Sequence, residues 1–319
     1  MIRPIRQKPA RKVIVFGATG LVGSACVEAA IRRGYRVQAV GGQNHPQFPD
    51  AEKCLTVEAT NSEAVERYVL EEWPDAVINA AAVSNPQDVD RNPEIAERVN
   101  VGFPAQLALL TRHLGAKLVH FSTDMVFDGQ TGNYQSTAMP SPVNAYGRTK
   151  LAAEEGILEG NPFDPVVLRI TIVTGSSPGG SRSVHEKMLA SIYEKKQLEL
   201  FTDELRQPVS ASNVAAVAVE LLDRPELHGI FHWAGSDRLS RYEMGCRILE
   251  HFNLDPRDWI LPRLRADNPA FANRPGDLTL DLHPLVGKLL TRPPSFAEQL
   301  QEMKPPAKLY RWLRSLASG

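Results

Sequence analysis

Side chains that can together move a proton lie between residues 122 and 150. The triplet Ser122-Thr123-Asp124 follows a short apolar run, and Tyr146 and Lys150 stand four positions apart further along. On a helix over 144–159, Tyr146 and Lys150 would lie one turn apart on the same face. The phenol would act as an acid, the ammonium would lower its pKa from about 10, and the hydroxyl would hold a substrate oxygen. The alternative is an amphipathic helix that happens to carry both residues.

The start of the chain has the pattern of a dinucleotide site. The apolar run Lys12–Phe16 leads into Gly17, Gly20 and Gly23, and a helical pattern follows over 21–33. A strand, a glycine turn and a helix in this order let the backbone approach a pyrophosphate at the helix N-terminus. A tight turn without a ligand is the alternative.

The segment after the second expected strand, 35–40, bears on which cofactor binds. NAD sites usually place an acid there for the ribose hydroxyls. This chain reads Gly41-Gly42-Gln43-Asn44-His45 instead, so no acid would repel a 2′-phosphate. We therefore predict that NADP(H) is favoured over NAD(H), although no arginine follows directly. Glu58, after a third strand over 53–57, is the candidate partner of the adenine amino group, and a solvated loop acid is the alternative.

The order of the elements predicts the fold class. Strands over 12–16, 35–40, 53–57, 75–79, 117–122 and 165–169 alternate with helical patterns. This cadence is typical of an α/β, Rossmann-type, doubly wound parallel sheet. The glycine turn, the run Ala80-Ala81-Ala82 and the triplet at 122–124 all follow strands, so they should meet at one edge of the sheet.

The expected domains follow from the same pattern. We predict a flexible basic tail over 1–11 and a nucleotide-binding domain over 12–170, with contributions from 198–235. A smaller C-terminal substrate-binding lobe would cover most of 171–319. A long helix over 93–114 would carry Asn100, whose side chain would bind backbone or water near the site, or else make a plain interhelix hydrogen bond.

Composition excludes several classes of function. The net charge is −1, with 43% hydrophobic and 23% charged residues, which does not favour nucleic acid or a membrane surface as partner. Three distant cysteines and no histidine pair at ligand spacing predict neither disulfides nor a metal site. A cytoplasmic location is the simplest expectation.

The motifs GATGLVG, NAAA, STD and YGRTK stand in the order found in the extended short-chain dehydrogenase/reductase superfamily, which this sequence resembles. Within that branch, FSTDMVFDG, NAYGRTKLAAEE and RPGDLTLD are similar to the dTDP-4-dehydrorhamnose reductases. The run GIFHWAGSDRLSRYEMGCRILEHFNL is most similar to the regulatory beta subunits of methionine adenosyltransferase, which bind NADP.

The resemblance implies roles for individual residues. Thr123 would be the catalytic hydroxyl, Tyr146 the general acid and Lys150 the residue that lowers its pKa and holds the nicotinamide ribose. Cofactor contacts are expected from Gly17, Thr19, Gly20, Leu21, Val22, Gly23, Gly42, Glu58, Ala59, Asn79, Ala80, Ala81, Ala82, Asn100, Ser122, Tyr146, Lys150 and Ile170. Substrate contacts are expected from Val83, Asp124, Met125, Ile172, Arg206 and Arg274.

Two departures bear on the substrate. Met125 stands where the reductases usually have tyrosine and the sugar-nucleotide dehydratases have glutamate, and Ile172 takes the place of a tryptophan. We predict an NADPH-dependent reductase of a 4-keto nucleotide sugar, with a homodimer as one expected assembly. The alternatives are another sugar-nucleotide reductase or epimerase, and a non-catalytic NADP-binding subunit that docks on an adenosyltransferase-like enzyme through 303–319.

Overall fold

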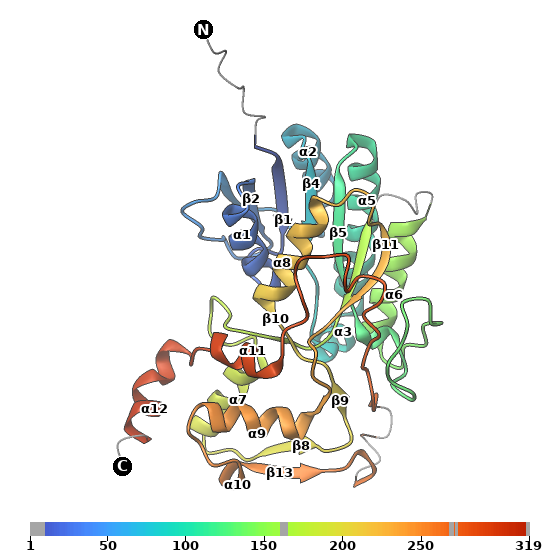
Figure 1. Cartoon of the computed structure of the whole chain (residues 1–319). Helices are drawn as coiled ribbons and strands as arrows, with labels where there is room; N and C mark the ends of the chain where they lie inside the picture. Colours follow the sequence, from blue (N-terminus) through green and yellow to red (C-terminus); the bar gives the residue numbers. More distant parts are fainter. Residues whose placement is uncertain (1–9, 160–164, 268–270, 272–273, 317–319) are drawn as a thin grey trace.

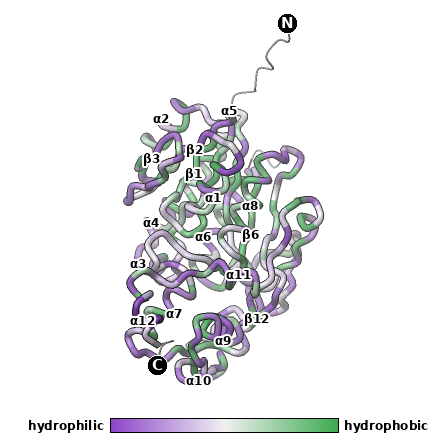
Figure 2. Tube along the Cα trace, turned by 60° about the vertical axis from the view of Figure 1, so that its left-hand side comes forward, coloured by the Kyte–Doolittle hydropathy of each residue, from purple (hydrophilic) through white to green (hydrophobic). Residues whose placement is uncertain are grey.

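The computed structural model describes residues 10–159, 165–267, 271 and 274–316 (Figure 1). Most of the predicted basic tail lies outside the described residues. The chain forms a sheet domain and, below it in Figure 1, a smaller lobe that contains α7, α9 and α10. Figure 2 shows the same two parts from another side, with apolar residues concentrated along the strands and along α8.

The central sheet has seven strands in the order β11-β6-β5-β4-β1-β2-β3. They are β1 (Lys12–Phe16), β2 (Arg36–Gly41), β3 (Lys53–Thr56), β4 (Ala76–Asn79), β5 (Lys117–Thr123), β6 (Val166–Ile170) and β11 (Gly229–Trp233). Every neighbouring pair is parallel. Short β-branched strands suit a sheet buried on both faces. The predicted Rossmann-type fold is confirmed.

Helices cover both faces of the sheet. On one face α1 (Leu21–Arg32) and α8 (Ala211–Leu222) share a core with Val13 and Val15. On the other face α2 (Ser62–Glu72), α5 (Phe103–Leu114) and α6 (Ala145–Leu158) share a core with Ile14 and Phe16. This alternation along β1 follows from the two-residue period of a strand. The helix that carries Tyr146 and Lys150 is therefore fixed against the sheet.

The predicted single helix over 93–114 is wrong in its middle. It consists of α4 (Pro93–Glu97), a π-helical turn at Arg98–Gly102 and α5, and α3 (Pro86–Arg91) precedes it. Pro104 explains the break, because it has no N–H to donate to the carbonyl of Asn100 and its ring would clash with that carbonyl. The amide of Phe103 instead bonds the carbonyl of Arg98, five residues back.

The lobe has its own apolar core, which includes Leu189, Ile248 and Phe296. Its elements are α7 (Val184–Tyr193), β8 (Leu198–Phe201), β9 (Leu205–Arg206), β12 (Leu239–Ser240), α9 (Arg241–His251), α10 (Pro256–Trp259), β13 (Ile260–Arg263), α11 (Phe296–Glu302) and α12 (Tyr310–Leu316). A two-stranded pair, β7 (Val173–Thr174) with β10 (Val209–Ser210), lies between the lobe and the sheet domain in the chain order.

The stretch 198–235 is divided between the two parts. Helix α8 and β11 belong to the sheet domain, as predicted, but β8 pairs with β13 and β9 pairs with β12 in the lobe. The predicted contribution of 198–201 to the main sheet is thus wrong. Among the described residues, no helix is long and apolar enough to cross a membrane.

Candidate functional site

Two glycines at the turn after β1, Gly17 and Gly23, have no room for a Cβ atom. A Cβ on Gly17, which has φ +77°, would lie 2.6 Å from the backbone of Ala80 and Ala81. A Cβ on Gly23 would lie 2.1 Å from the carbonyl oxygen of Gly17. The start of α1 thus lies close to the turn after β4, and its N-terminus, which is half-buried and has no side-chain cap, faces the carboxyl edge of the sheet. Backbone amides in this position suit a pyrophosphate.

A cavity of about 570 Å³ opens at this edge of the sheet. Twelve of the predicted residues line it, and they come from five separate segments: Gly20, Leu21, Val22, Ala80, Ala81, Ala82, Ser122, Thr123, Tyr146, Lys150, Ile170 and Ile172. The structure therefore brings the expected catalytic triplet and the expected cofactor turn to one space.

Thr123 and Tyr146 interact directly at the end of β5. The Thr123 side chain hydrogen-bonds Tyr146, and its Oγ1 also donates to Asp124 Oδ1 over 3.1 Å and accepts from the Met125 amide over 3.2 Å. Burial, followed by the charge of Asp124, raises the pKa of Tyr146. The lowered pKa that we expected from Lys150 is not found, and the phenol is held in its protonated form.

Asp124 is itself shielded from water. It is 5% exposed, and burial raises its pKa to about 6, against the opposing effects of the charge of Arg206 and the hydrogen bond from Thr123. Asp124 does not line the cavity but lies against the hydroxyl of Thr123, and its contact with substrate stays a prediction.

Lys150 points to a partner that the sequence did not reveal. Its Nζ lies 2.8 Å from Nε2 of His120, a fully buried residue of β5. Asn79 Oδ1 accepts from the Ala81 amide, so its Nδ2 faces His120 Nδ1 over 3.0 Å and must donate. The hydrogen of a neutral imidazole is then on Nε2, which makes Lys150 the acceptor and therefore a neutral amine.

The electrostatics of this pair agree with that assignment. Burial lowers the pKa of Lys150 from 10.5 to about 7, and burial is also the main cause that lowers the pKa of His120 well below 6.5. A proton on Lys150 would lower the pKa of His120 further. Asn79, predicted as a cofactor contact, thus orients the histidine and the turn at Ala81.

Asn100 fixes the loop that follows β4. Its Oδ1 accepts from the Val83 amide over 2.9 Å, and its Nδ2 donates to the Val83 carbonyl and to Thr149 Oγ1, each over 3.1 Å. The predicted backbone contact of Asn100 is therefore found, and it ties the Ala80-Ala81-Ala82 wall to α6. Val83 takes part through its backbone and does not line the cavity.

Ser122 is positioned by a buried ion pair between Glu154 and Arg169. It hydrogen-bonds Glu154, whose carboxylate also accepts from Arg169, with Nη2 to Oε2 at 2.6 Å. The side chains of Arg169 and Glu154 are 1% and 2% exposed. This network joins β5, α6 and β6 behind the reactive edge, where Thr123 and Ile170 are neighbours in register.

The predicted substrate arginines are used elsewhere. Arg206 donates to the carbonyls of Leu205, Pro275 and Gly276, and Arg274 pairs with Glu204. Neither lines the cavity, and Met125 packs in a separate apolar cluster with Phe127 and Leu280. None of Arg206, Arg274 and Met125 lines the cavity, and their contacts with substrate stay predictions.

Three other cations line the cavity from the lobe: Arg182, Lys187 and Arg241. Burial lowers the pKa of Arg241 to about 10, and no side-chain partner of its guanidinium is found among the described residues. Sequence reasoning missed all three, although the Ser240 capping box at the start of α9 marked the place of Arg241.

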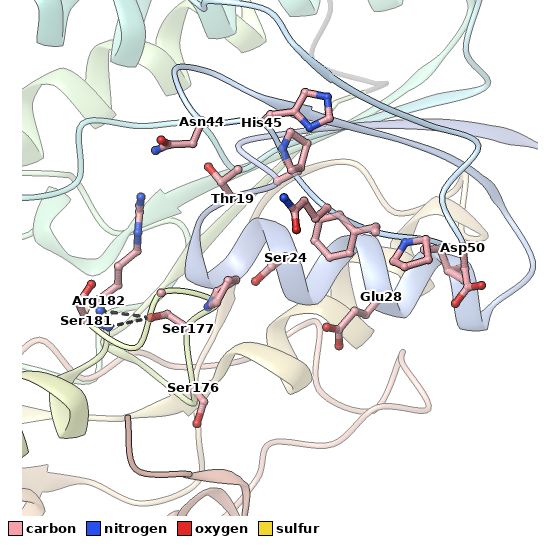
Figure 3. Close-up of a pocket in the computed structure, with 18 of the residues that line it drawn as sticks. Thr19, Ser24, Glu28, Asn44, His45, Asp50, Ser176, Ser177, Ser181 and Arg182 are labelled. Carbon is pink, nitrogen blue, oxygen red and sulfur yellow. Dashed lines mark hydrogen bonds between the residues drawn. The ribbon is translucent and has the colours of Figure 1, made fainter. Parts of the chain in front are cut away.

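A second cavity, of about 890 Å³, lies beside the start of α1 (Figure 3). Thr19 lines it, and Arg182 borders both cavities. Gly42, Glu58 and Ala59 line neither of the two, so the structure leaves their predicted contacts with a cofactor untested. No group of three or more histidine, cysteine or acidic residues at metal-binding geometry occurs in the described part of the chain.

Comparison with known proteins agrees with this geometry. The chain matches the RmlD substrate binding domain over residues 11–308. It is 32% identical over 280 residues to methionine adenosyltransferase 2 subunit beta of Rattus norvegicus, across 86% of this chain and 81% of that protein. It is 33% identical over 294 residues to a probable low-salt glycan biosynthesis reductase of Haloferax volcanii, across 91% and 96% of the two chains.

Solved structures share the fold over almost the whole chain. A dTDP-4-dehydrorhamnose reductase of Bacillus anthracis in complex with NADP superposes with a TM-score of 0.80 at 22% identity, across 92% of this chain and 98% of that one. A hypothetical dTDP-4-dehydrorhamnose reductase of Sulfolobus tokodaii gives 0.78 at 26% identity, across 92% and 99%. The resemblance stated from the sequence motifs is confirmed.

Proposed function

We infer the function from the fact that this chain belongs to the family of the RmlD substrate binding domain, within the extended short-chain dehydrogenases/reductases. It is an NAD(P)-dependent oxidoreductase by this membership. We propose that it reduces the 4-keto group of a nucleotide-linked sugar with NADPH. The observation that carries the proposal is that Thr123, Tyr146 and Lys150 line one cavity together with the glycine turn.

The residues present fit a dinucleotide. Gly17 and Gly23 have no side chains that could block the turn, and no side chain makes a capping hydrogen bond at the N-terminus of α1. The backbone amides there are thus available to a ligand. Gly20, Leu21 and Val22 would hold the pyrophosphate, Ala80–Ala82 would lie under the nicotinamide half, and Lys150 would hold its ribose. The reduced nicotinamide would supply a hydride when bound.

Tyr146 would protonate the oxygen that develops from the carbonyl. Its pKa is raised, so the phenol enters the reaction with its proton in place. The Thr123 hydroxyl, which donates to Asp124 in this structure, would turn to donate a second hydrogen bond to the same oxygen, since it already hydrogen-bonds Tyr146. Lys150 lies one turn from Tyr146, and its pKa near 7 lets it take up a proton once the tyrosinate forms. The resulting ammonium would then stabilise the tyrosinate.

The lobe would select the substrate. Lys187 and Arg241 face the cavity with no acid among its lining residues, a charge pattern that suits the diphosphate of a sugar nucleotide. The apolar Ile172 and Met188 on the same wall would lie against the sugar or the base.

The test is NADPH oxidation in the presence of a panel of 4-keto nucleotide sugars. Tyr146→Phe should lose about 10²- to 10⁴-fold in kcat and keep its affinity for NADPH, because only the proton donor is removed. Tyr193→Phe, on an exposed tyrosine of α7 outside the cavity, is the matched control. Turnover by Tyr146→Phe at the rate of the parent protein would refute the mechanism.

A second function is favoured by one observation, the 32% identity to methionine adenosyltransferase 2 subunit beta over 280 residues. Under it, the chain would bind NADP without turnover and dock on an adenosyltransferase. Gel filtration of the chain mixed with a purified adenosyltransferase catalytic subunit distinguishes the two. A stable complex without NADPH oxidation on any 4-keto nucleotide sugar would favour the subunit over the enzyme.

A further inference from the structure

Three segments far apart in the sequence meet around the 890 Å³ cavity. They are the glycine turn with Thr19, the loop after β2 with Asn44 and His45, and the loop after β7 that ends at Arg182. Figure 3 shows the long side chain of Arg182 extending from the lower loop toward Thr19 and Asn44. The cavity is thus rimmed by donors next to the turn that would hold a cofactor.

The backbone of Arg182 is anchored while its guanidinium is not. The amide of Arg182 donates to Glu186 Oε2 over 2.8 Å and to Ser177 Oγ over 3.3 Å. Glu186 also accepts from the amides of Ser177 and Ser183, which fastens the loop to the first turn of α7. Among the described residues, the guanidinium has no hydrogen-bond or ion-pair partner. A side chain with an anchored backbone and an unpaired guanidinium charge is suited to bind an anionic ligand.

The loop after β2 brings two more polar side chains, Asn44 and His45, to the cavity near Thr19. A Cβ on Gly41 would lie 1.9 Å from the carbonyl oxygen of Asn44, so the chain turns back sharply at the end of β2. This turn exposes the side chains of Asn44 and His45 beside Thr19 (Figure 3). The acids of the cavity, Glu28 and Asp50, lie on its opposite side in the same view, and Glu28 is paired with Arg32.

We propose that Arg182, with Thr19, Asn44 and His45, forms the binding site for the 2′-phosphate of NADP. The inference rests on the proposed function, because it needs a dinucleotide on the glycine turn. The adenosine ribose of such a cofactor lies beyond the carboxyl end of β2, where an arginine accommodates a 2′-phosphate. Here no arginine follows β2, and Arg182 supplies the cation from the lobe, across the cavity. Cofactor selection and the position of the lobe are thereby linked.

Direct binding tests this without any substrate. The affinities of the parent protein and Arg182→Ala for NADPH and NADH are measured by the fluorescence of the bound nicotinamide. Arg182→Ala should bind NADPH about 10- to 100-fold more weakly, since a hydrogen-bonded charge is lost, and should bind NADH with little change. Arg182→Lys should recover part of the loss, because the charge returns without the bidentate geometry.

Lys187→Ala is the control, because it removes a neighbouring positive charge that lines only the first cavity. It should leave the preference for NADPH over NADH intact. Equal weakening of NADPH and NADH in Arg182→Ala would place the arginine on the pyrophosphate and overturn the proposal, as would an unchanged affinity for both. Failure of the reductase assay with a normal NADPH preference would count against the proposed reaction alone.

Discussion

Replacing Lys150 by methionine should make the cofactor-free protein more stable at neutral pH, and the gain should vanish as the pH rises. Lys150 is 2% exposed, and burial lowers its pKa from 10.5 to about 7. Since each pKa unit is worth about 1.4 kcal/mol, a proton on this buried amine costs on the order of 5 kcal/mol. Methionine fills similar space without a charge and removes that cost.

The sign follows from the protons bound in each state. Between pH 7 and 10.5 the unfolded chain carries a proton on Lys150 that the folded chain does not. The stability of the parent protein therefore rises with pH in this window, by about 1.4 kcal/mol per pH unit relative to Lys150→Met. Below pH 7 both states are protonated, and the difference between the two proteins should stay constant.

Urea unfolding of both proteins, followed by circular dichroism from about pH 6 to about pH 10, gives the difference directly. Other titrating groups cancel because they are common to both. Lys187→Met, at an exposed lysine, is the control and should run parallel to the parent protein. Parallel curves for Lys150→Met as well would refute the neutral Lys150 and its pairing with His120.

Three further outcomes test other parts of the site. Gly23→Ala should abolish NADPH binding, because its Cβ would strike the carbonyl of Gly17. Gly102→Ala, with open space at its Cβ, should bind NADPH normally, and fluorescence titration measures the affinity of both variants. Glu154→Gln should lower the free energy of unfolding by about 3–5 kcal/mol, because it leaves the buried charge of Arg169 unpaired, and an unchanged urea midpoint would contradict this. Arg241→Gln should raise KM for the nucleotide sugar with NADPH affinity unchanged, and a loss confined to kcat would argue against a role in substrate binding.

Short-range patterns predicted much of the fold and half of the site. The strand, glycine turn and helix from Lys12 onward are local, and so is the spacing that sets Tyr146 and Lys150 on one face of α6. Parallel topology then places the strand ends together, which is why Thr123 was found from its position after β5. The π-helical turn could also have been anticipated, because Pro104 cannot donate the hydrogen bond that an α-helix needs there.

The remainder depends on contacts between distant residues. His120 reads as an ordinary strand residue, and only the register of β4 and β5 puts it between Asn79 and Lys150. Arg182 and Arg241 reach the site from the lobe, whose placement no local pattern specifies. Arg206 and Arg274 have side chains that could bind an anion. In the structure, however, Arg206 donates to backbone carbonyls and Arg274 pairs with Glu204.

The strand β8 was misplaced for the same reason. Its sequence predicts a strand equally well in either sheet, and its partner β13 lies about sixty residues further on. Pairing across such a separation is set by packing of the lobe core, which a local pattern does not specify.

The central claim is that the protein reduces a 4-keto nucleotide sugar in the cavity between the glycine turn and the lobe. NADPH would supply the hydride and Tyr146 the proton. The most direct test is single-turnover oxidation of bound NADPH on mixing with dTDP-4-keto sugars, for the parent protein and for Tyr146→Phe at matched cofactor occupancy. We predict rapid oxidation by the parent protein and a loss of about 10²-fold or more in the variant. Bound NADPH that stays reduced in the parent protein with every 4-keto nucleotide sugar, or that is oxidised equally fast in both proteins, would contradict the claim.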